Sequence, residues 1–99
     1  MPESPLRSAL ERVTVIVVTF NSAHCLQALA SLLAPCPHVI IVDNGSDDGC
    51  SAEARRLLPY ARVIELGRNL GFGAANNRAL DLVETPFAFL LNQIGRAHV

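Results

Sequence analysis

The chain contains no lysine and no tryptophan, and it has one tyrosine and three cysteines among its 99 residues. All eight basic residues are arginines and the formal net charge is −1, so the basic face that nucleic-acid binding requires is not expected. Cys25, Cys36 and Cys50 are odd in number and lack Cys-x-x-Cys spacing. This pattern favours reduced thiols over a disulfide framework or a zinc site.

Long apolar runs are also missing. No stretch approaches the ~20 residues of a membrane span, and the first twelve residues lack the apolar core of a signal peptide. We therefore expect a cytoplasmic protein. With 51% hydrophobic residues, the chain can bury a modest core, as one small domain or as part of a larger one.

Four apolar runs alternate with helix-like segments from residue 13 onward. Residues 13–19 and 38–42 have the composition of strands that are buried on both faces, and residues 61–66 and 87–91 are expected to form a third and a fourth strand. Helices are expected after residue 21, with Asn21 or Ser22 as N-cap, and over residues 51–58 and 73–83. The order βαβαβαβ predicts an α/β, Rossmann-like fold with a mostly parallel sheet. Residues 1–12 are predicted to be a loosely ordered lead-in.

Three polar segments stand at the ends of the first three expected strands. They are residues 17–21 (VVTFN), 42–49 (VDNGSDDG) and 69–77 (NLGFGAANN). Open α/β sheets bind ligands at this edge, so the three loops predict a nucleotide site. Asp43 either accepts hydrogen bonds from a ligand or closes an Asx turn with the backbone of Gly45 or Ser46. Asp47 and Asp48 fit loop or capping residues better than metal ligands.

The segment at residues 69–77 is harder to explain as structure alone. Gly71 and Gly73 allow close backbone approach, and the helix amino terminus behind them offers free N–H groups to a phosphate. Asn76 and Asn77 can both donate and accept hydrogen bonds, which suits a base or ribose edge. The alternative is a helix cap packed on the sheet, with Asn69 as the capping residue. We expect Asp43 and this turn to face each other across one crevice.

The loop after the first expected strand excludes several other nucleotide-binding classes. The Gly-x-Gly-x-x-Gly fingerprint of dinucleotide-binding domains is missing there, and a P-loop is impossible without lysine. The acidic pair of receiver domains and the Gly-rich basic loop of sugar-nucleotide pyrophosphorylases are absent too. A stand-alone nucleotide-binding or regulatory α/β module without catalysis remains an alternative.

Together these segments resemble the amino-terminal portion of family 2 glycosyltransferases, which have the GT-A fold. The resemblance covers residues 13–92 and is greatest to the subgroup of rhamnosyl- and galactofuranosyl-transferases. It implies the nucleotide-binding half of a GT-A domain, a UDP- or dTDP-sugar donor, and a glycan or lipid-linked acceptor. It also implies a role in cell-surface polysaccharide or glycolipid synthesis, at the inner face of the membrane in the full-length protein.

Residue roles are implied by the same resemblance. Asp43 would hold uracil or thymine through N3–H, Thr19 and Asn21 would border the base and ribose, and Gly71 would line the pocket beside the third helix. The residues assigned to nucleotide binding are Thr19, Phe20, Asn21, Asp43, Asn69, Gly71, Phe72 and Asn77.

The resemblance ends at Asn92. Similar enzymes bind a divalent cation, Mg²⁺ or Mn²⁺, through an Asp-x-Asp-type motif after the fourth strand, which in this subgroup reads Asn-Pro-Asp. Here Gln93 comes after Asn92, so the metal-binding Asp is lost, and the catalytic base is expected further downstream. Residues 94–99 equal one translated frame of a common sequencing adapter, whose junction also explains Gln93. We therefore expect residues 93–99 to be non-native and the truncated chain to be inactive; a natural Gly-containing turn is the alternative.

Overall fold

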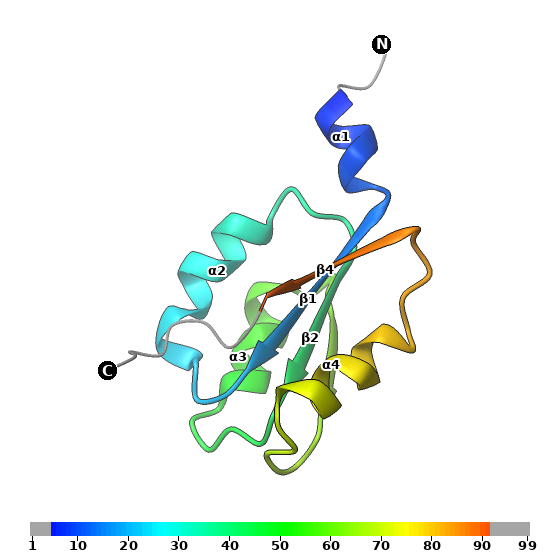
Figure 1. Cartoon of the computed structure of the whole chain (residues 1–99). Helices are drawn as coiled ribbons and strands as arrows, with labels where there is room; N and C mark the ends of the chain where they lie inside the picture. The colour runs from blue at the N-terminus through cyan, green and yellow to red at the C-terminus, as the bar shows by residue number, and fades with distance from the viewer. Residues whose placement is uncertain (1–4, 92–99) are drawn as a thin grey trace, which may run out of the picture.

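The computed structural model describes residues 5–91, which alternate between helices and strands (Figure 1). Asn92 and residues 93–99 lie outside this range. The described elements, in chain order, are α1 (Pro5–Leu10), β1 (Val13–Thr19), the 3-10 helix η1 (Ala23–Cys25), α2 (Leu26–Leu33), β2 (Val39–Asp43), α3 (Cys50–Leu57), β3 (Arg62–Glu65), α4 (Phe72–Leu80) and β4 (Phe87–Leu91).

The four strands form one parallel sheet in the order β3-β2-β1-β4. The prediction of an α/β, Rossmann-like fold is thereby confirmed. Strands β1 and β2 occupy the centre, and nearly all of their residues are buried. A central strand in a sheet covered on both faces needs apolar side chains on both sides, which explains the unbroken β-branched runs.

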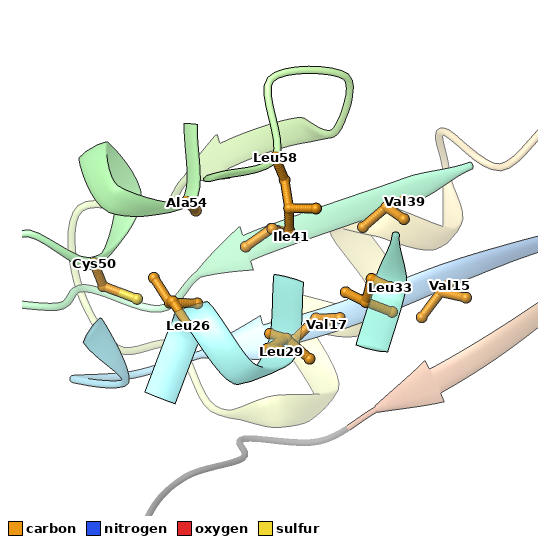
Figure 2. Close-up of a cluster of buried hydrophobic side chains, with 10 residues drawn as sticks. All are labelled: Val15, Val17, Leu26, Leu29, Leu33, Val39, Ile41, Cys50, Ala54 and Leu58. Carbon is orange, nitrogen blue, oxygen red and sulfur yellow. The ribbon is translucent and has the colours of Figure 1, made fainter. Parts of the chain in front are cut away.

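Alternate residues of β1 and β2 enter two separate cores. On one face, Val17 and Ile41 pack with Leu26 and Leu29 of α2 and with Ala54 of α3. Figure 2 shows these side chains meeting between the strands and the two helices. On the other face, the core consists of Ile16, Val18, Ile40, Val42, Ala75 and Ala79, the last two from α4. The small alanine side chains allow α4 to lie close to the sheet.

Strand β4 differs from the central strands because it lies at an edge. Its residues are exposed except Leu91, which is half-buried. Phe87 and Phe89 remain more than half exposed, at 57% and 56%. Over the part of the chain that the structure describes, no helix is both long and apolar enough to cross a membrane.

Two details of the predicted layout are corrected. The lead-in, predicted to be loosely ordered, contains helix α1, which buries none of its residues. Pro5 at its first position has a backbone dihedral that suits a helix start, and the alanine and leucines that come after it favour helix. Helix α4 ends at Leu80, three residues before the predicted end, although Leu82 and Val83 still pack on its core.

Candidate functional site

The loops after β1, β2 and β3 meet at the carboxyl edge of the sheet. This arrangement results from the strand order, since β2 lies between the other two strands and runs parallel to both. Thr19 is paired with Asp43, and Asp43 with Glu65, so the three strands end at nearly the same level. The structure therefore brings the three predicted loop segments to one edge.

Asp43 is 5% exposed, and its carboxylate accepts three hydrogen bonds. Oδ1 accepts from Thr19 Oγ1 at 2.9 Å and from Ser46 Oγ at 2.6 Å, and Oδ2 accepts from the Ser46 N–H at 3.0 Å. The bonds to Ser46 form the Asx turn that was the structural alternative for this residue. Because a carboxylate has about four acceptor sites, Oδ2 can accept one further bond.

Asn21 joins the first loop to the second. Its N–H donates to Ser46 Oγ at 2.8 Å, and its Oδ1 accepts from the Asp47 N–H at 2.9 Å. Its φ of 51° lies in the left-handed region, which asparagine tolerates better than most residues. Ser46 thus contacts both predicted residues Asn21 and Asp43, a role that the sequence analysis did not assign to it.

Asp48 caps two helices from its place in the second loop. Its Oδ2 accepts from the Ala23 N–H at the start of η1, at 3.0 Å, and its Oδ1 accepts from the Cys50 N–H at the start of α3, at 3.1 Å. The predicted capping by Asn21 or Ser22 is wrong, because Ser22 Oγ bonds to the backbone of Phe20 instead.

Among residues 5–91, no group of three or more His, Cys, Asp or Glu side chains could hold a metal ion.

Asn44 links the second loop to the third and is 1% exposed. Its Nδ2 donates to Asn69 Oδ1 at 3.1 Å, and its Oδ1 accepts from the Leu70 N–H at 2.8 Å. Asn69 Oδ1 also accepts from the Gly71 N–H at 2.8 Å. Asn69 therefore does not cap α4, whose N-cap is Gly71. The sequence offered one overlooked signal, an asparagine directly after the last residue of a central strand.

Asp43 and Asn44 have different partners because successive side chains of a pleated strand point to opposite faces of the sheet. Asp43 bonds to Thr19 and lies beside buried Cys50, on the face that α2 and α3 cover. Asn44 comes next on the opposite side and bonds to the turn that enters α4. The expectation that Asp43 itself faces this turn is thus corrected. The two loops do meet, but Asn44 makes the contact.

The remaining predicted residues lie at the start of α4. Gly71, Phe72 and Asn77 are exposed, and Phe72 retains 40% of its accessible surface. The neighbouring Asn76 has a buried Oδ1 for which the structure shows no hydrogen-bond partner. At this end of α4 a ligand could contact the exposed residues Gly71, Phe72 and Asn77, whereas Asn76 Oδ1 is shielded.

The thiol of Cys50, next to the Asp43 network, is buried. Burial raises the pKa of Cys50, an effect that a hydrogen bond with Thr19 partly opposes, and burial also raises the pKa of Cys25. None of the three cysteines forms a disulfide within residues 5–91. A thiol with a raised pKa is a weak nucleophile at neutral pH, so these side chains serve packing.

Fold and loop arrangement define a parallel α/β domain with polar loops at the carboxyl edge of the sheet, where such folds bind ligands. Within that class, the chain belongs to glycosyl transferase family 2, whose family model matches residues 14–93. The family predicted from the sequence is thus confirmed.

Two named relatives belong to bacteria. The chain is similar to the N-acetylglucosaminyl-diphospho-decaprenol L-rhamnosyltransferase of Mycobacterium tuberculosis, with 37% identity over 70 residues that cover 67% of this chain and 23% of that protein. It is also similar to the teichoic acid poly(glycerol phosphate) polymerase of Staphylococcus epidermidis, with 30% identity over 95 residues, 84% of this chain and 13% of that protein. The chain thus spans less than a quarter of the length of these curated relatives. No solved structure matches it.

Proposed function

We propose that the chain is the nucleotide-binding part of a glycosyltransferase that takes its sugar from a nucleoside diphosphate sugar. The observation that carries this proposal is that the loops after β1, β2 and β3 meet at one sheet edge, where Asp43 bonds to Thr19 and the next residue, Asn44, bonds to the glycine-bearing turn before α4. Membership of glycosyl transferase family 2 supports sugar transfer. The relatives' names support a lipid-linked or polymeric acceptor in cell-surface synthesis.

Asp43 is proposed to recognise the nucleobase of the donor. Its Oδ2 accepts a single internal hydrogen bond, which leaves an acceptor for the N3–H of uracil or thymine. Cytosine has an acceptor at N3 and no N3–H, so it could not donate this hydrogen bond to the carboxylate. Thr19 holds the other carboxylate oxygen, while Phe20 and Asn21 would border the base and ribose through the first loop.

The diphosphate is proposed to lie toward the start of α4. Gly71, Phe72 and Asn77 would line this part of the site, and Asn69 would shape the turn before it. Backbone N–H groups at a helix amino terminus attract phosphate oxygens through hydrogen bonds and through the helix dipole. UDP and dTDP present the same diphosphate, so this end of the site does not distinguish them.

The chemical step needs two groups, which, we propose, the complete protein supplies outside residues 5–91. A base must take the proton of the acceptor hydroxyl as the new glycosidic bond forms and the bond to the diphosphate breaks. A divalent cation, Mg²⁺ or Mn²⁺, would offset the charge that builds on the leaving diphosphate. We therefore propose that this chain binds the donor nucleotide without transferring sugar, and that the complete protein carries out the transfer.

Nucleotide titrations of the 99-residue chain test the proposal. Isothermal titration with UDP, dTDP and CDP is expected to show binding of the first two and clearly weaker binding of CDP. Asp43→Ala should weaken UDP binding by about tenfold, the equivalent of one lost hydrogen bond to a charged group. Glu53→Ala on α3 is the matched control, because the Glu53 carboxylate pairs with Arg56 and takes no part in the Asp43 network, and unchanged affinity is expected. Equal affinity for all three nucleotides, unaffected by Asp43→Ala, would contradict the assignment.

A further inference from the structure

Asn44 uses both ends of its side-chain amide to hold the third loop. The carbonyl oxygen accepts from the Leu70 N–H and the amino group donates to Asn69 Oδ1. The Asn44 side chain is 1% exposed, so the loss of either bond would leave one end of its buried amide unpaired. The bond from the Gly71 N–H to Asn69 Oδ1 extends the network to the N-cap of α4.

Gly45, the next residue, places the two loops in direct backbone contact. A Cβ atom at this position would lie 2.6 Å from the carbonyl carbon of Arg68 and 2.8 Å from the backbone nitrogen of Asn69. Its φ of +89° is also a conformation that side chains disfavour. The close approach and the two amide bonds together specify where the turn at residues 69–71 lies relative to the end of β2.

We propose that Asn44 is a positioning residue for the nucleotide. It contacts no ligand group itself, and it holds residues 69–71 in the conformation that directs Gly71 and Phe72 toward the donor. This inference rests on the proposed function and deepens it. Without Asn44 the turn would sample other conformations, and the nucleotide would have to order the turn when it binds.

The network requires different chemistry at its two ends. Asn44 acts as both donor and acceptor, so Asn44→Asp removes the donor and brings a carboxylate against Asn69 Oδ1. Asn69 acts in these bonds only through Oδ1, so Asn69→Asp keeps an acceptor for both of its donors. Aspartate should therefore be tolerated at residue 69 and disruptive at residue 44.

Titration of the 99-residue chain with UDP tests the ligand half of the inference. Asn44→Ala is expected to weaken UDP binding by about tenfold. Asn69→Ala should weaken it by a smaller factor, and because Asn69 is exposed this variant carries less risk to folding. Thr14→Val is the matched control, since it removes a part-buried hydrogen bond to Thr85 at the other end of the sheet. It should lower the urea midpoint and leave UDP affinity unchanged.

Amide hydrogen exchange, read by NMR, tests the positioning itself. The Leu70 amide should be protected in the wild type and in Asn69→Asp, and should exchange faster in Asn44→Ala and Asn44→Asp. Wild-type UDP binding that Asn44→Ala and Asn69→Ala leave unchanged would overturn this inference alone, as would unchanged Leu70 exchange. A wild-type chain with a protected Leu70 amide that binds neither UDP nor dTDP would overturn the proposed function and the ligand half together.

Discussion

Gly45 is the glycine at which an added methyl group should destabilise the fold most. Gly45→Ala would combine a left-handed φ with contacts below 3 Å to the backbone of Arg68 and Asn69, neither of which can move aside cheaply. We expect it to lower the free energy of unfolding by about 2–4 kcal/mol. Gly49→Ala is the control, because its φ of +78° is also left-handed but no atom lies within 4 Å of the added carbon. It should cost about 1–2 kcal/mol.

Urea denaturation of the two variants separates the two costs. The difference between the two losses in free energy of unfolding isolates the cost of the contact between the loops, since both variants carry the backbone strain. Equal losses would contradict the close approach at Gly45.

The residues of the site were only partly predictable from the sequence. Thr19, Asn21 and Asp43 could be named because each stands where an apolar strand run ends, and parallel strands end at one edge. Asn44 was missed because an Asn-Gly pair is common in turns of any protein. Its buried bonds to Asn69 and Leu70 depend on how two loops, 25 and 26 residues apart in the sequence, pack against each other.

At the scale of helices and strands, Asp48 connects two helix starts through one carboxylate. Asp48→Ala would leave the N–H groups of Ala23 and Cys50 without these acceptors. We expect a loss of about 1–2 kcal/mol in the free energy of unfolding, the usual cost of a lost helix cap. Asp47→Ala is the control, because Asp47 takes part through its backbone N–H, which the substitution keeps. Its unfolding free energy should stay within about 0.5 kcal/mol of the wild type.

Urea titration of both variants at neutral pH gives the comparison. A loss in Asp47→Ala as large as that in Asp48→Ala would show that general charge in the loop, and not capping, stabilises the helix starts.

The presence of a helix or strand was easier to predict from the sequence than the residues at which it begins, ends or is capped. The β-branched runs indicated β1 and β2 because only a strand buried on both faces tolerates such a composition. The capping of η1 was not predictable, since the acceptor comes from a loop 25 residues away and not from the adjacent Ser22. Helix α1 was missed because the sequence shows no apolar stripe there, and the helix indeed buries nothing.

At the scale of the whole molecule, the sheet is unevenly covered. Strands β1 and β2 have helices on both faces, whereas β4 pairs with β1 along one edge and has no partner strand on its other edge within residues 5–91. An apolar groove of about 500 Å³ runs beside β4, lined by Leu10, Val13, Val15, Leu32, Leu33, Cys36, Phe87, Ala88, Phe89 and Leu91. Each large side chain left in water forgoes about 1.5–3 kcal/mol of burial, against the ~5–15 kcal/mol that stabilises a typical domain.

We therefore expect the isolated chain to be weakly stable and to self-associate through β4 as its concentration rises. The strand has no charged residue between Phe87 and Leu91, and an uncharged apolar edge pairs readily with another strand. Phe89→Glu places a charge on this edge and should increase the monomer fraction in sedimentation velocity. Leu6→Glu on α1 is the control, since Leu6 is 69% exposed and lies outside the sheet, and it should leave self-association unchanged. A wild-type chain that stays monomeric and melts in one sharp thermal transition would show that the open edge of β4 costs the molecule little.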